Sequence, residues 1–123
     1  MTTERTPDYL TTHVLAGERL VFALDHEATE LASGLASGGH RAVTLVKEEG
    51  LRVVLVVLGV GGRLDEHLVA GPTTVLLLKG RVRLTAGGKA VLLLPHQMVA
   101  LGANVRHDAV AEEDSTLLIS VVM

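Results

Sequence analysis

From residue 40 to the end of the chain, short apolar or alternating segments follow one another, and turn residues separate them. Gly87-Gly88 predicts a two-residue hairpin, because paired glycines allow the positive φ that tight hairpin turns need. An acidic turn, Glu112-Glu113-Asp114, separates the last two segments. We read about eight short strands, and such regular spacing with turn signals is typical of a closed or sandwiched antiparallel fold. The sequence therefore predicts an all-β domain.

One segment ahead of the strands has the period of a helix. Its apolar residues recur at steps of three or four, which places them on one face of a helix: Leu20, Leu24, Ala28, Leu31 and Leu35. The pattern predicts one α-helix over about Ala16 to Ala36, ended by Gly38-Gly39. We divide the chain into an N-terminal arm and helix, residues 1–39, and a β-barrel, residues 40–123, which together form one structural domain.

Two of the expected strands are apolar on both faces. They are Leu51 to Leu58, LRVVLVVL, and Lys89 to Leu94, KAVLLL. In a small barrel only one face of each strand points into the interior, so the apolar outer faces of these two strands must be buried by something else. The apolar face of the predicted helix can bury only part of them. Large exposed apolar patches are rare on soluble monomers. We therefore expect a homodimer.

Composition excludes several classes of function. The only aromatic residues are Tyr9 and Phe22, and the net charge is −3, so neither base stacking nor a phosphate-binding face is expected. There is no cysteine, which excludes disulfides and thiolate metal sites. The longest apolar runs, such as Val53 to Leu58, are too short to span a bilayer. We expect a cytoplasmic protein with no nucleic-acid or membrane partner.

The stretch from Gly61 to Gly80, GGRLDEHLVAGPTTVLLLKG, has a distinctive spacing. It resembles the first signature motif of the cupin superfamily: Gly, five residues, His-x-His, three or four residues, Glu, six residues, Gly. His67 falls on the first histidine of that motif. Val69 stands in place of the second histidine and Thr73 in place of the glutamate, so the glycine frame is kept while two ligand positions are lost.

A second match lies between His96 and Ala111. The second cupin motif is Gly, five residues, Pro-x-Gly, two residues, His, three residues, Asn, and His107 falls on its histidine. Asn104 stands in place of a glycine and tolerates positive φ better than most residues. Gly102 stands at the proline. The resemblance implies a cupin-like antiparallel β-barrel (a double-stranded β-helix or jelly roll) with one N-terminal α-helix.

The resemblance implies a ligand-binding site formed by His67, Val69, Thr73 and His107 at the mouth of the barrel. Asp65 has the parity of His67 by simple strand alternation, and Glu66 has the opposite parity. Cupin metal sites usually present three histidines and a carboxylate. We therefore expect no tightly bound metal, and at most a weakly bound divalent ion at His67 and His107.

Three functions stay open. The first is a small cupin-like protein that binds a small organic ligand without tight metal. The second is an enzyme that uses a weakly held divalent metal or histidine acid–base chemistry. The third is a structural or regulatory dimer with a vestigial pocket. No serine lies in a nucleophile-elbow context and no glycine pattern suits a phosphate, so no catalytic residue is assigned.

Overall fold

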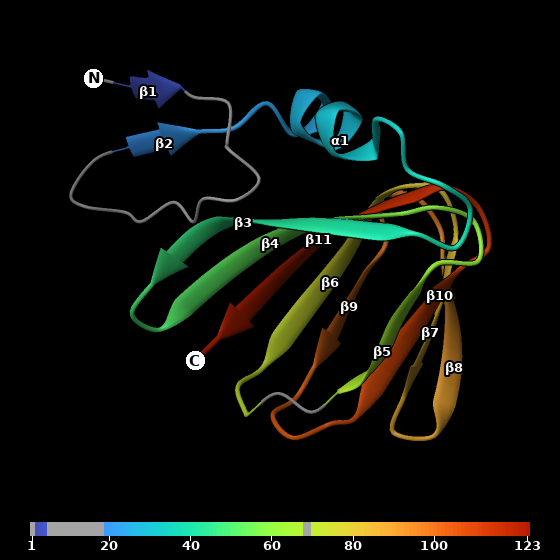
Figure 1. The fold of residues 1–123 in the computed structure, drawn as a ribbon. Coiled ribbons are helices and arrows are strands. Elements are labelled where there is room, and N and C mark those ends of the chain that lie inside the picture. Colours follow the sequence, from blue (N-terminus) through green and yellow to red (C-terminus); the bar gives the residue numbers. More distant parts are fainter. Residues whose placement is uncertain (1, 5–18, 68–69) are drawn as a thin grey trace.

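The computed structural model describes residues 2–4, 19–67 and 70–123 (Figure 1). Twelve elements follow in order: β1 (Thr2–Glu4), β2 (Arg19–Val21), α1 (Leu24–Ala32), β3 (His40–Glu48), β4 (Leu51–Leu58), β5 (Arg63–His67), β6 (Thr73–Lys79), β7 (Val82–Ala86), β8 (Lys89–Leu93), β9 (Met98–Leu101), β10 (His107–Ala111) and β11 (Ser115–Val122). Of the two strands whose bounds were predicted above, β4 matches its segment and β8 ends one residue earlier than Leu94.

Two antiparallel sheets form the body of the molecule. One has five strands in the order β3-β4-β11-β6-β9, and the other has four in the order β5-β10-β7-β8. Strands that are distant in the sequence lie side by side, as β4 and β11 do over their whole length. The two sheets are the walls of a jelly-roll barrel (Figure 1), which confirms the predicted fold class.

The inside of the barrel is filled by aliphatic side chains from both sheets. Strand alternation turns every second residue inward, and the buried set is almost entirely Val, Leu and Ala: Val56, Leu58, Val75, Leu77, Val82, Leu84, Leu93, Ala109, Ala111 and Leu117. With so few aromatic residues, the core depends on branched aliphatic side chains that fit a pleated surface.

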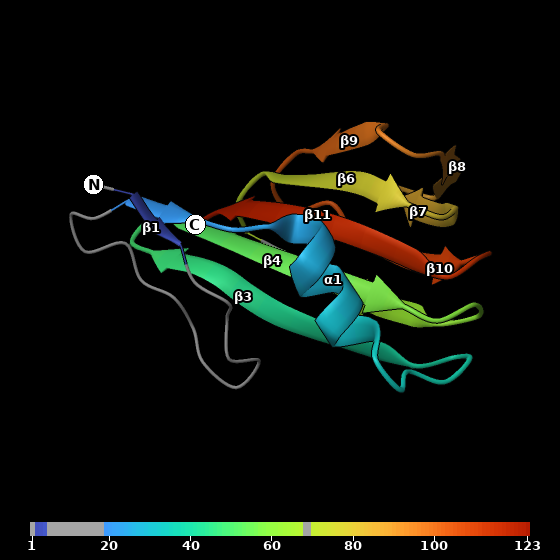
Figure 2. The ribbon, with the colours of Figure 1, turned by 90° about the horizontal axis from the view of Figure 1, so that it is seen from above.

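A second apolar cluster lies on the outside of the five-stranded sheet. Leu55 and Val57 of β4 point away from the barrel interior and pack with Val43 and Leu45 of β3. Helix α1 covers them with Leu31, which is 1% exposed. Figure 2 shows α1 lying over β3 and β4. The chain itself thus covers both faces of LRVVLVVL, as the double-sided apolar pattern of that strand predicts.

The helix is shorter than predicted. It spans Leu24–Ala32, and residues 19–21, which we expected to be helical, form β2 instead; residues 16–18 lie outside the described residues. Val21 and Phe22 favour extended structure. The helix ends at Gly34 (φ 75°) and not at the later glycine pair, because a residue in the left-handed region ends the helical hydrogen bonding.

Arg41 of β3 fixes the C-terminal end of α1. Its Nη1 donates hydrogen bonds to the carbonyl oxygens of Leu31, at 3.2 Å, and Ser33, at 2.6 Å. The last carbonyls of a helix have no partner within the helix, and a guanidinium group complements their partial negative charge. The guanidinium thereby ties the helix end to the first strand of the barrel.

The short parallel pair β1–β2 was not predicted. Thr2 to Glu4 pair in register with Arg19 to Val21. Three-residue strands carry too little periodicity to be recognised, and we interpreted the polar N-terminus as an arm. No helix among the described residues is long and apolar enough to cross a membrane.

Glu27 is a carboxyl group on the buried side of α1. Its side chain is 1% exposed, and desolvation by burial raises its pKa above the ordinary value of 4.5; the neighbouring His26 lowers it and Glu30 raises it. A raised pKa means that the folded state binds the proton more tightly, so stability falls as pH rises above 4.5.

We therefore expect Glu27→Gln to be more stable than the wild type at pH 7, because the neutral amide is not penalised by burial. The gain should disappear at a pH below 4.5, where the wild-type carboxyl is protonated in both states. Urea unfolding at the two pH values measures it. Glu49→Gln, at an exposed position of the β3–β4 turn, is the control, because Glu49 does not contribute to the pKa shift of Glu27; an equal gain there would contradict the prediction.

Candidate functional site

Four positions of the cupin-like spacing share one backbone conformation. Gly61 (φ 81°), Gly80 (φ 95°), His96 (φ 71°) and Asn104 (φ 62°) all lie in the left-handed region, and His96 and Asn104 are the only non-glycine residues described there. Each stands where the motifs have a glycine. The turns that the motif glycines make are thus present in this chain even where the glycine itself is replaced, and the prediction for Asn104 is confirmed.

Gly80 has an additional reason to lack a side chain. A Cβ at this position would overlap the Ser115 hydroxyl and the carbonyl oxygen of Asp114. The Ser115 hydroxyl is buried and accepts the Arg81 N–H at 3.0 Å, and it can donate to the carbonyls of Glu113, at 2.7 Å, or Arg81, at 3.3 Å. This serine joins the β6–β7 turn to the β10–β11 turn, which makes its role structural.

The two motif histidines lie opposite each other across neighbouring strands. His67 ends β5 and His107 begins β10, and their Cα positions are partners in the antiparallel register. Thr73 begins β6, and all three residues belong to the strand ends at the lower end of the barrel in Figure 1. The predicted site residues that the structure describes therefore lie at one end of the barrel; Val69 lies outside the described residues.

His107 is a buried imidazole, 7% exposed, next to the aliphatic core. Its Nδ1 lies 3.1 Å from the carbonyl oxygen of Val105. A carbonyl can only accept, so Nδ1 carries the hydrogen and Nε2 of the neutral ring carries the lone pair. The backbone contact fixes the ring with one tautomer, which suits a group that must accept a proton or hydrogen bond from a ligand.

Thr73 adds a second buried polar group. It is 3% exposed and on the inward-facing side of β6, in line with the core residue Val75. Its hydroxyl donates to the carbonyl of Gly71 at 3.4 Å, a long hydrogen bond. Leu101 is its partner on β9 and is 8% exposed. This end of the barrel thus combines a hydroxyl and an imidazole with aliphatic neighbours.

Strand β5 is irregular just before His67. Leu64 pairs with Ala109 and packs on the core, whereas His67 pairs with His107, so the register shifts by one residue between these pairs. Asp65 is exposed. Simple alternation gave Asp65 the parity of His67, but alternation does not hold across an irregularity of this kind, which adds one residue to a strand.

Few metal-ligating side chains gather among the residues whose side chains are described. No three His, Cys, Asp or Glu side chains whose positions are described come close enough together to hold an ion. Thr73 offers a neutral hydroxyl at the position where the cupin motif has a carboxylate. Catalytic zinc, for comparison, typically keeps three protein ligands.

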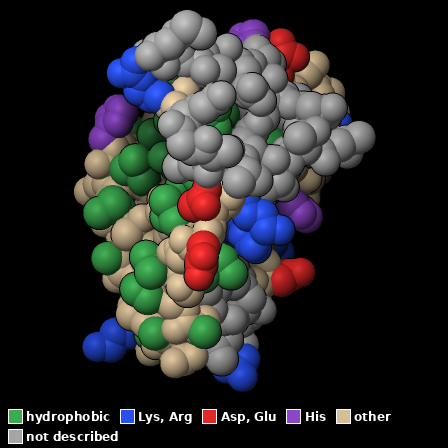
Figure 3. Space-filling view, turned by 90° about the vertical axis from the view of Figure 1, so that its left-hand side faces the viewer, with side chains coloured by type: hydrophobic (Ala, Val, Ile, Leu, Met, Phe, Trp, Pro, Cys, Tyr) green, Lys and Arg blue, Asp and Glu red, His purple; other side chains and the backbone are tan. Residues whose placement is uncertain are grey.

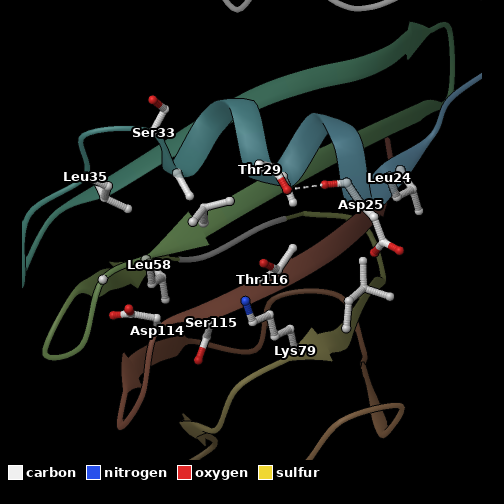
Figure 4. A pocket seen from close by; sticks show the side chains of 15 residues that line it. Leu24, Asp25, Thr29, Ser33, Leu35, Leu58, Lys79, Asp114, Ser115 and Thr116 are labelled. Atoms are coloured by element: carbon white, nitrogen blue, oxygen red, sulfur yellow. Dashed lines mark hydrogen bonds between the residues drawn. The ribbon is translucent and has the colours of Figure 1, made fainter.

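A separate groove lies outside the barrel, between α1 and the five-stranded sheet. Its volume is about 530 Å³, and its floor is apolar, with Ala28, Val57 and Leu78. Asp25 of the helix and Lys79 of β6 approach the groove from opposite sides (Figure 4). None of the predicted site residues lines it. Sequence patterns gave no sign of this groove, because it depends on how far the helix covers the sheet.

Arg81 and Arg83 form ion pairs at the protein surface. Arg81 Nε lies 3.1 Å from one carboxylate oxygen of Glu112, and Arg83 Nε lies 3.0 Å from the other. His40 and His96 are exposed, as expected for histidines at turns or strand ends.

Comparison with known proteins links the chain to solved structures. No protein-family profile and no curated protein sequence matches it. A cupin superfamily protein from Desulfitobacterium hafniense has a TM-score of 0.69 at 19% identity over 76% of this chain and 87% of that one. A conserved Streptococcus pyogenes protein of unknown function has a TM-score of 0.66 at 22% identity, covering 75% and 82%.

An enzyme is also among the similar structures. The salicylate 1,2-dioxygenase of Pseudoaminobacter salicylatoxidans has a TM-score of 0.67 at 20% identity over 80% of this chain, but the match covers 31% of the dioxygenase. Identities this low show the fold alone. The two antiparallel sheets, the left-handed turns at the motif positions and these neighbours agree, and the chain has a jelly-roll barrel similar to those of cupin superfamily proteins.

Proposed function

We propose that this protein binds a small, largely apolar organic ligand at the barrel end where β5, β6 and β10 meet, without a tightly bound metal. The observation that carries the proposal is the buried imidazole of His107, with its Nδ1 3.1 Å from the carbonyl oxygen of Val105, on a residue whose register partner is His67. Sites for small molecules commonly combine apolar walls with a few polar groups that orient the ligand.

The chemistry of the described groups narrows the ligand class. In the tautomer with the hydrogen on Nδ1, the lone pair of the His107 ring is on Nε2, and Thr73 carries a hydroxyl. A ligand with an O–H or N–H donor on a small hydrocarbon body, such as a phenol, an alcohol or a protonated acid, matches both features. The same imidazole could act as a general base, which is how an enzymatic function would use it.

A thermal-shift screen of phenols, alcohols and short carboxylic acids tests the proposal. A ligand that binds only the folded protein raises the melting temperature by an amount that grows with the ratio of its concentration to its dissociation constant. We expect the shift to disappear in His107→Gln and to persist in Lys79→Gln, which alters the outer groove instead. A shift lost in Lys79→Gln but kept in His107→Gln would place binding in the groove and contradict the proposal.

Metal content distinguishes the enzymatic alternative. We expect less than one equivalent of zinc, iron, manganese, nickel or copper per chain in protein purified without chelator or affinity tag, because the site lacks a carboxylate and a third imidazole. Elemental analysis measures it. One equivalent of metal that is lost in His67→Ala or His107→Ala would instead support a cupin enzyme.

Assembly is the other part of the proposal: we propose a homodimer in the cytoplasm. Exposed apolar side chains support it, among them Val91, Leu92, Leu94 and Met98, which are 38–58% exposed. Figure 3 shows further hydrophobic side chains on the side of the molecule that is at the left in Figure 1, away from β8. A dimer without ligand response in the screen would support the third function, a structural or regulatory dimer.

A further inference from the structure

We propose that strand β8 is the surface through which two copies of this chain associate, by antiparallel pairing of β8 with its counterpart about a two-fold axis at Leu92. This inference rests on the homodimer proposed above and specifies which surface forms its interface. Of the two double-sided apolar strands seen in the sequence, β4 is covered within the chain, whereas β8 is not. Four of the five residues of β8 are exposed.

Strand β8 is an open edge. It ends the four-stranded sheet and pairs only with β7 among the described strands. The outer side of an edge strand presents unpaired N–H and C=O groups and can receive another strand. In β8 the pairing would centre on Ala90 to Leu92, because the N–H and C=O of the following Leu94 already bond to Gln97. Its side chains add apolar surface: Val91 is 42%, Leu92 38% and the following Leu94 44% exposed.

The other edges carry features that oppose pairing. Strand β3 has Arg41, Lys47 and Glu48 and an irregular register, and β5 has acidic residues and its own register shift. Strand β9 has four residues. Charges, bulges and short length are the means by which proteins protect edges. Strand β8 has a continuous register with β7 and one charged residue, Lys89, at its start.

The sequence of β8 is complementary to itself. A two-fold axis perpendicular to the sheet makes the same patch meet on both copies and pairs residues of like parity. With the axis at Leu92, Ala90 faces the second copy's Leu94, Val91 faces Leu93, and Leu92 faces Leu92. Every pair is apolar.

Other registers are less favourable. An axis at Val91 sets Lys89 opposite Leu93, which buries an ammonium group against an aliphatic side chain. An axis at Leu93 sets Val91 opposite Pro95, which has no N–H to donate. The Leu92 register leaves Lys89 opposite Pro95 at the ends of the ladder, where solvent reaches both.

Opposite charges at position 92 give a specific test. In Leu92→Lys or Leu92→Glu, like charges face each other on the axis and the apolar contact is lost. We expect each variant to weaken the dimer by at least about tenfold, measured by sedimentation velocity across a concentration series. An equimolar mixture of the two variants should restore dimer, because Lys then faces Glu.

Val122→Lys is the matched control, because Val122 is 51% exposed and lies at the end of the molecule opposite β8 in both ribbon views. It should dimerise like the wild type, and circular dichroism checks that every variant is folded. If the wild type dimerises but Leu92→Lys does so equally well, or if the mixture does not recover, β8 is not the interface while the homodimer stands. A wild type that stays monomeric overturns both.

Discussion

Gly80→Ala is expected to lower the free energy of unfolding by about 2–5 kcal/mol. Gly80 has a φ of 95°, a conformation that costs alanine about 1–2 kcal/mol. The new methyl group would also overlap the Ser115 hydroxyl and the Asp114 carbonyl, so the junction between two turns would have to move. Urea unfolding with a constant m-value measures the loss.

Gly61→Ala is the control for that prediction. Gly61 has a similar φ of 81°, but a Cβ there meets nothing within 4 Å. Its cost should be the backbone term alone, about 1–2 kcal/mol. Equal losses in the two variants would show that the overlap at Ser115 relaxes without cost.

Leu77→Ala is expected to lower the free energy of unfolding by about 2–5 kcal/mol, because it opens a cavity in a closely packed interior. Leu77 is 0% exposed and lies among the residues that fill the barrel. Its neighbour Leu76 points to the other face of β6 and is partly exposed.

Leu76→Ala therefore removes the same atoms from the same strand, and its cost should be about 1 kcal/mol or less. The difference between the two, read from urea unfolding curves, tests which face of β6 is the inside of the barrel. A larger loss at Leu76 would reverse the assignment.

The barrel was predictable because its signals are local and repeated. Alternating side chains and glycine turns bound each strand, and neighbouring segments repeat the pattern. Leu51–Leu58 is an example: its apolar residues on both parities predicted two covered faces, and the structure confirms both. The helix boundaries were less accessible, because Val21, Phe22 and Gly34 act against a periodicity that extends past them.

For the candidate site, the positions of the turns were more predictable from the sequence than the pairing register of the strands. The spacing predicted a positive φ at Asn104, which the structure confirms, whereas the positive φ of His96 was not predicted. The register shift near His67 was not predictable, because it is set by pairing with β10 and leaves no periodic trace. Simple alternation therefore could not show that Asp65 is exposed.

Strand β4 gives side chains to both apolar clusters: Val56 and Leu58 to the barrel, and Leu55 and Val57 to the helix layer. Because the same strand packs against both the barrel interior and the helix, a loss of packing on one side disturbs the packing on the other. Arg41 adds a polar tie between the helix end and β3. The division near residue 40 therefore separates two kinds of secondary structure but does not separate two independently stable units. Helix and barrel should melt in one cooperative transition, and calorimetric and van't Hoff enthalpies should agree.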